Sequence, residues 1–99
     1  MNRTTIDRTT QGARVKFARR ARGLTQGQLA ELVSEQVVTP ISNNIISEIE
    51  KGNRGVWNDE MHALVEILDQ TRDWLEGTGG EFNVPKGVYE HWDQLAFAV

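Results

Sequence analysis

The chain of 99 residues contains no cysteine. This absence excludes disulfide bonds, zinc sites built on thiolates and cysteine nucleophiles. No apolar run approaches the roughly 18 residues that a membrane span requires. The polar N-terminus MNRTTIDRTTQ also lacks the apolar core of a signal peptide, so we expect a cytoplasmic protein without a membrane partner.

Signals for β-structure are also scarce. No long stretch alternates apolar and polar residues, and no Asn-Gly or Asp-Gly turn is flanked by strand-like segments. Apolar residues instead recur at helical spacing. Hydrophobic residues make up 38% of the chain and charged residues 25%, which is typical of a folded domain rather than a disordered one. Length and pattern together predict a single all-α domain.

Residues suited to catalysis or metal binding are few. His62 and His91 are the only histidines, and His91 with its acidic neighbours falls short of the three or four ligands of a metal site. The serines have no nucleophile-elbow context. GTGG at 77–80 lacks the Lys-Ser/Thr pair and the helix start of a phosphate loop. We therefore expect no enzyme activity, no cofactor, no metal and no small-molecule ligand.

Charge is distributed unevenly, although the formal net charge is only −3. Residues 1–54 carry nine Lys and Arg against five Asp and Glu, a balance of +4. Residues 55–99 carry two against nine, a balance of −7. A basic half beside an acidic half suggests that one face meets a polyanion. A surface dipole without function is the alternative that charge alone leaves open.

Capping and breaker residues divide the first half into helices. Residues 1–9 are polar and are expected to form a flexible arm. A helix over about 10–21 follows, and Gly23, which tolerates a left-handed conformation, ends it. Thr25 and Gln28 form a capping box at the start of a second helix. Apolar residues continue at helical spacing, so this second helix is predicted to extend to about Val37. These apolar residues are Leu29, Leu32, Val33 and Val37.

Three further helices are predicted before residue 77. Pro40 interrupts the chain, and Ser42 can cap a third helix over 43–51. Asn58 can cap a fourth helix, and Thr71 can cap a short fifth one. The expected helical domain therefore covers residues 10–77.

Residues 78–99 are expected to form a linker and a C-terminal tail helix. The segment GTGGEFNVPKG has the composition of a linker. The apolar residues after it share one helical face: Val88, Trp92, Leu95 and Val99. This face either folds back on the domain or contacts a partner, and a homodimer contact is one such role.

The predicted third helix has two unlike faces when its residues are placed at intervals of about 100°. Ile45, Ile46 and Ile49 cluster on one face, with Glu50 at its edge. The opposite side carries polar residues: Asn43, Asn44, Ser47, Glu48 and Lys51. An asparagine amide can donate to N7 of adenine and accept from its N6 amine, so exposed asparagines suit base reading. Helix capping and simple exposure to water are the alternative that the wheel leaves open.

A family resemblance bears on this choice. RRARGLTQGQLAEL, followed by IISEIEKGNR, resembles the helix-turn-helix domain of phage Cro and repressor proteins, the XRE-type or lambda-repressor-like family. The resemblance covers about residues 13–77 and includes TRDWLEG, similar to the family's short fifth helix. It implies a compact five-helix domain whose third helix lies in the major groove of operator DNA. It also implies a sequence-specific transcription regulator, of phage or mobile-element repressor or Cro type, acting in a bacterial cell or phage-infected host.

Site residues follow from the resemblance position by position. The residues that it places at base edges are Asn43, Asn44, Ser47 and Glu48. It places Gln26, Asn53 and Arg54 along the DNA backbone. The further candidates for backbone contacts are Thr25, Arg20, Arg22 and Lys51. Arg19 and Glu50 occupy positions where the family often has a buried ion pair. The helical wheel independently puts Glu50 beside the apolar face.

The chain departs from the family between Ala30 and Ile46, where it has several more residues than the usual spacing. SEQVVT is the expected insertion. The apolar spacing up to Val37 predicts that it lengthens the second helix by a turn or more. Such an insertion can change the angle of the reading helix or add contacts near Thr39.

A protein-interaction module, similar to an antitoxin or antirepressor, is the alternative function. The acidic half holds most of the large aromatic residues: Trp57, Trp74, Tyr89 and Trp92. Interfaces favour Trp and Tyr, but small cores also use Trp. We expect Trp74 in the core, whereas Trp92 is equally suited to a core or an interface.

Overall fold

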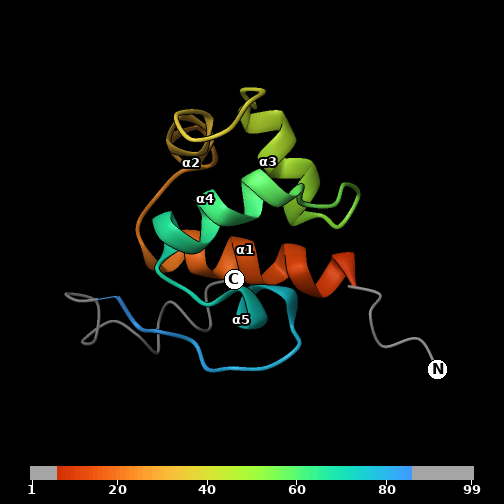
Figure 1. The fold of residues 1–99 in the computed structure, drawn as a ribbon, viewed down its shortest axis with the longest axis vertical. Helices are drawn as coiled ribbons and strands as arrows, with labels where there is room; N and C mark the ends of the chain where they lie inside the picture. The colour runs from red at the N-terminus through yellow and green to blue at the C-terminus, as the bar shows by residue number, and fades with distance from the viewer. Residues whose placement is uncertain (1–6, 86–99) are drawn as a thin grey trace.

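The computed structural model describes residues 7–85, and every regular element within this range is an α-helix (Figure 1). The helices are α1 (Arg8–Ala21), α2 (Gln26–Ser34), α3 (Asn43–Glu50), α4 (Asn58–Leu68) and α5 (Arg72–Glu76). The predicted all-α, five-helix architecture is therefore confirmed. The predicted tail helix lies outside the described residues, with its apolar positions Val88, Trp92, Leu95 and Val99.

Helix α1 begins earlier than the predicted residue 10. Asp7 caps it, because its carboxylate accepts from the Thr9 backbone N–H at 2.9 Å and from the Thr10 hydroxyl at 3.2 Å. The segment 7–9, expected in a flexible arm, is thus part of the helix start. The sequence does not indicate this cap, because polar residues follow Asp7. An N-cap is identified in a sequence by the apolar periodic pattern that comes directly after it.

The connection between α2 and α3 differs most from expectation. Helix α2 ends at Ser34, so the insertion does not lengthen it to Val37, and that prediction is wrong. The Ser34 hydroxyl instead bonds both the N–H and the carbonyl oxygen of Ile41, at 2.9 and 3.0 Å. The Val38 N–H donates to Asp59 on α4 at 3.1 Å. Val37 still packs against the core, from a loop rather than from a helix.

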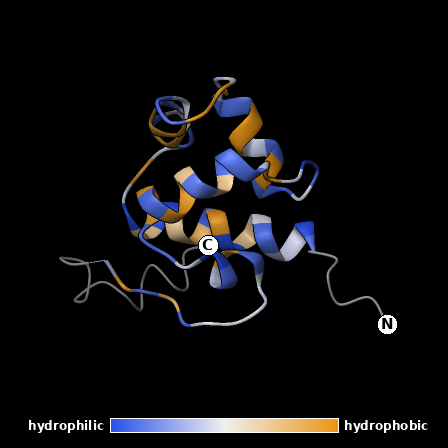
Figure 2. Ribbon diagram, viewed as in Figure 1, coloured by the Kyte–Doolittle hydropathy of each residue, from blue (hydrophilic) through white to orange (hydrophobic). Residues whose placement is uncertain are grey.

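The core lies where the five helices meet. Figure 2 shows apolar and hydrophilic segments alternating along the helices, as expected for helices with one buried side. The fully buried apolar side chains come from every helix: Val15, Ala18, Leu29, Val33, Ile46, Ile49, Met61, Ala63, Leu64, Leu68 and Leu75. Trp74 is also buried, as predicted. This core fixes the orientation of α3 relative to α1 and α2.

Gly12 sets the closest approach between α1 and the C-terminal end of α3. A Cβ atom added to Gly12 would lie 2.8 Å from the Glu50 carbonyl oxygen and nearer still to that of Ile49. Real Cβ atoms do not approach backbone oxygens this closely. The crossing of α1 and α3 therefore requires glycine at this position.

The chain stays packed beyond α5, although residues from 78 onward were expected to form a linker. Thr71 caps α5 as predicted, and Gly77 ends the helix with φ 78°. Phe82 then packs on Phe17 and Trp74, with ring centroids 5.0 and 4.8 Å apart. The Asn83 N–H donates to Gln70 at 2.8 Å. These contacts hold the described end of the chain against α1, α5 and the turn between α4 and α5.

Candidate nucleic-acid interface

Helix α3 is anchored through its isoleucines and presents its polar residues outward. Ile46 and Ile49 are buried and Ile45 is half-buried. Asn43 and Asn44 are exposed. Among the described residues, neither asparagine side chain has a hydrogen-bond partner, and the N-cap residue Ser42 makes no side-chain capping bond. The asparagine amides are therefore not used to cap the helix, and their donors and acceptors are available to a ligand.

The other two predicted base-edge residues flank the asparagines. Ser47 is half-buried, and its hydroxyl has no hydrogen-bond partner within residues 7–85. Glu48 is half-buried and more occupied, because it accepts from the Asn53 amide at 3.2 Å and pairs with Lys51 at 3.7 Å. The carboxylate thus ties α3 to the loop that follows it.

A network of three side chains joins α1, α2 and α3. Arg19 binds both carboxylate oxygens of Glu50, with N–O distances of 2.5 and 3.1 Å. Arg19 also donates to the Leu24 carbonyl oxygen at 2.8 Å. The Gln26 amide donates to Glu50 at 2.9 Å. Since the Glu50 side chain is only 3% exposed, this network is internal and fixes the start of α2 beside the end of α3.

Gln26 therefore has a structural contact that its sequence position alone does not reveal. Its neighbour Thr25 forms the predicted capping box with Gln28, through bonds of 3.0 and 2.8 Å. Arg20 in the last turn of α1 and Arg22 at its C-cap lie immediately before this corner, and within the described chain neither forms an ion pair. The basic end of α1 and the start of α2 thus bring these backbone-contact candidates together.

Arg54, expected along the DNA backbone, is engaged inside the protein. Its two terminal nitrogens bind the two carboxylate oxygens of Glu60 at 2.8 and 2.9 Å. Its guanidinium also lies over the Trp57 ring, 4.4 Å from the centroid. The hydrogen bond to Glu60 raises the pKa of Arg54, against the effect of burial. The sequence does not reveal this group, because Glu60 looks like an ordinary acidic residue of a first helical turn.

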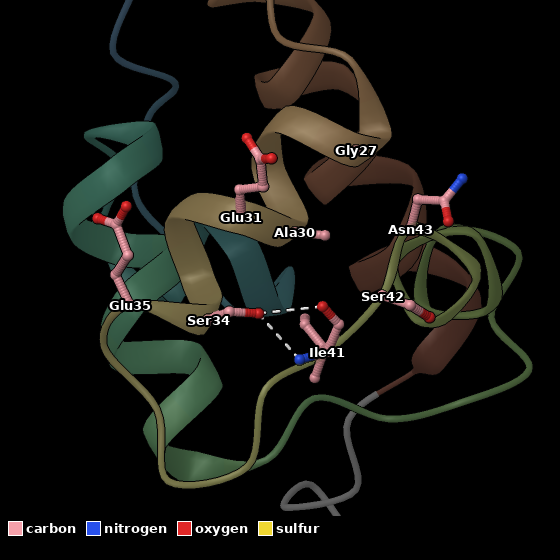
Figure 3. Close-up of a pocket in the computed structure, with 8 residues that line it drawn as sticks. All are labelled: Gly27, Ala30, Glu31, Ser34, Glu35, Ile41, Ser42 and Asn43. Carbon is pink, nitrogen blue, oxygen red and sulfur yellow. Dashed lines mark hydrogen bonds between the residues drawn. The ribbon is translucent and has the colours of Figure 1, made fainter.

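A shallow hollow of about 710 Å³ lies between α2 and the start of α3. Figure 3 shows Glu31 and Glu35 on the α2 side and Asn43 across from them. The bonds between Ser34 and Ile41 close its floor. Its open shape and acidic side chains distinguish it from the enclosed, mostly apolar pockets that bind small molecules.

Residues 7–85 contain neither a cluster of metal-ligating side chains nor a membrane-spanning helix. No group of three or more His, Asp or Glu side chains in this part of the chain is placed to hold a metal ion. None of the helices between residues 7 and 85 has the length and apolar character needed to cross a membrane.

This chain is similar to a solved structure, and other comparisons found no match. No model of a known protein family matches, and no curated protein matches. The restriction-modification controller protein C.AhdI from Aeromonas hydrophila shares 28% sequence identity with the chain and superposes with a TM-score of 0.59. The match covers 70% of this chain and 96% of C.AhdI, so nearly the whole of that protein has a counterpart in this one.

Proposed function

We propose that the protein is a sequence-specific regulator of transcription that binds double-stranded DNA and places α3 in the major groove. The observation that carries this proposal is the outward face of α3. Asn43, Asn44 and Ser47 present unpartnered polar groups, while the isoleucines and Glu50 hold the helix rigidly from behind. An exposed polar helix that is fixed by packing suits the reading of base edges.

The proposed contacts divide into base reading and backbone positioning. Asn43, Asn44, Ser47 and Glu48 are the proposed base-reading residues. The proposed backbone contacts are Thr25, Gln26, Arg20, Arg22, Lys51 and Asn53. Arg54 is left out of this set because Glu60 occupies its guanidinium. Backbone contacts by cations provide affinity, and base contacts provide specificity.

Two kinds of transcription regulator are consistent with the proposed function. The sequence motifs resemble phage Cro and repressor proteins, which favours a phage or mobile-element repressor. The similarity to C.AhdI favours a controller of restriction-modification genes as the second candidate. Both candidates place the protein on an operator.

The alternative role as a protein-interaction module depends on the acidic half. Trp74 does not serve it, because its ring is buried against Phe17 and Phe82. Tyr89, Trp92 and the proposed homodimer contacts lie outside the described residues. Trp57 is the aromatic residue of this half that remains exposed in the described range.

Selection of binding sites from random duplex DNA tests the proposal. We expect enrichment of one short motif, and a palindromic motif would indicate two copies on two half-sites. The double variant Arg20→Gln/Arg22→Gln, which spares the structural Arg19, should lose binding to all duplexes. If the wild-type chain enriches no motif and the double variant behaves like it, the interaction-module role becomes the better account.

A further inference from the structure

Trp57 is unusually exposed for a tryptophan. Its exposed fraction is 55%, whereas tryptophan side chains are highly buried on average. Only Val38 is a more exposed large hydrophobic residue within the described chain. An exposed aromatic ring has a simple explanation when the surface it belongs to is covered by a ligand.

The Trp57 ring is nevertheless held in place. Its backbone N–H donates to Glu60 at 2.9 Å, and the Arg54 guanidinium lies over one ring face. Arg54 cannot leave easily, because it also binds both oxygens of the same buried Glu60 carboxylate. Within residues 7–85 the indole N–H has no hydrogen-bond partner. The Trp57 side chain thus presents a hydrogen-bond donor and a ring that is backed by a fixed cation. Its conformation is already restricted, so binding a ligand costs it little conformational entropy.

The position of Trp57 continues the proposed DNA-binding surface. The loop 51–57 leaves the end of α3 on the side away from α2 (Figure 1). The Asn53 backbone and side-chain nitrogens both donate to Glu48 on α3, at 2.9 and 3.2 Å. A helix in the major groove has a phosphate backbone on each side. The start of α2 binds Glu50 and this loop binds Glu48, and two side chains at this spacing leave a helix on opposite flanks, about 200° apart.

The charges around the loop 51–57 favour binding of a polyanion, although acidic residues lie near it. Arg8 lies beside Gly55, with its Nε 3.1 Å from the position of an added Cβ, and Lys51 is exposed on the loop. Asp59 is the nearby carboxylate that Arg54 does not neutralise. Both of its oxygens accept backbone N–H groups, from Glu60 at 2.9 Å and from Val38 at 3.1 Å.

We propose that Trp57 is a further contact to the DNA backbone, on the strand opposite the one met by α2. Its indole N–H donates to a phosphate oxygen, and the edge and open face of its ring lie on the adjacent deoxyribose. This inference rests on the proposed function. The contact carries no base information, because phosphate and sugar are the same at every position.

The test compares Trp57→Ala, Trp57→Phe and the wild-type full chain on a selected duplex and on a random duplex, over a range of salt. Trp57→Ala should lose about tenfold in affinity on both duplexes, as expected for a lost hydrogen bond to a charged group. Trp57→Phe, which keeps a ring but not the N–H, should lose less. The salt slope should not change, since Trp57 is uncharged. His62→Ala, an exposed change on α4, is the control and should bind as the wild type does.

The outcomes separate this inference from the proposed function. If wild type and Trp57→Ala bind equally tightly, Trp57 is no DNA contact, although the proposed function stands. If the wild type binds no duplex, both proposals fail. Thermal unfolding measures the stability of each variant, and sedimentation velocity measures its self-association. A loss of affinity that accompanies unfolding or loss of self-association in Trp57→Ala, and is absent from Trp57→Phe, would assign Trp57 to folding or to a protein interface and overturn the inference.

Discussion

Arg19 near the end of α1 and Glu50 at the end of α3 form a two-pronged ion pair, with N–O distances of 2.5 and 3.1 Å. Gln26 at the start of α2 joins the same carboxylate at 2.9 Å. The pair therefore joins three helices at one point. It positions the two elements of the helix-turn-helix relative to each other, and this geometry decides which side of α3 is exposed.

Breaking this pair from one side should be costly. Arg19→Met leaves a buried carboxylate without its cation, and we expect the free energy of unfolding to fall by about 3 kcal/mol. The double variant Arg19→Met/Glu50→Leu should recover most of that loss, because apolar replacement of a buried ion pair is often nearly neutral. Urea unfolding followed by circular dichroism measures both. Additive losses in the double variant would show that the two residues do not act as a pair.

Gly12 should tolerate no side chain. Gly12→Ala drives a methyl group into the carbonyl oxygens at the end of α3, and we expect a loss of about 3 kcal/mol. Gly27 on α2 is the matched control, because the nearest atom to an added Cβ is 3.9 Å away. Gly27→Ala should stabilise the protein by about 0.5–1 kcal/mol through helix propensity. Equal melting temperatures for the two variants would contradict the described crossing of α1 and α3.

Ser34 and Ser42 lie at the two ends of the long connection and should respond differently to loss of their hydroxyl groups. Ser34→Ala removes both bonds to Ile41, so we expect a loss of about 1–2 kcal/mol. Ser42→Ala should cost less than about 0.5 kcal/mol, since this N-cap serine makes no capping bond. Chemical denaturation of the two variants measures which of them loses more stability. A larger effect at Ser42 would mean that the loop is not held by Ser34.

Asn44 and Lys51 test the division between base reading and backbone positioning. Asn44→Ala should cost about 1–3 kcal/mol on the selected site and relax preference at one base pair. Lys51→Ala should weaken binding to every duplex alike and reduce the salt slope by about 1. Fluorescence anisotropy on selected and random duplexes provides the comparison. Equal losses on both duplexes for Asn44→Ala would place Asn44 outside base recognition.

The predicted features that the structure confirms are those whose sequence signals are local and complete. Thr25 and Gln28 form the expected capping box, and Thr71 caps α5. Ile46 and Ile49 face the core as the helical wheel predicted. In each case the residues that decide the structure are close in sequence, so propensity and periodicity contain the necessary information.

The prediction of a longer α2 failed because helical periodicity does not show which contacts a following loop can make. The apolar spacing up to Val37 favoured a longer α2, but Val37 packs equally well from a loop that Ser34 closes onto Ile41. Arg54 is assigned to the DNA backbone by the resemblance, which does not reveal that its guanidinium binds the buried Glu60, six residues further along the chain. Trp57 owes its fixed orientation to the same group. Sequence pattern places such residues on an element but does not reveal which partner occupies them.

The salt dependence of DNA binding is the sharpest test of α3 as a helix that lies in the major groove. The three proposed cationic contacts of one copy, Arg20, Arg22 and Lys51, give a slope of log K against log salt of roughly −3, and two copies on one duplex give roughly −5. The titration uses the full chain, a duplex carrying the selected site and a range of potassium chloride concentrations. A slope within this range is the predicted result. A slope near zero, at any affinity, would contradict the account of α3 as a helix positioned in the major groove by backbone contacts.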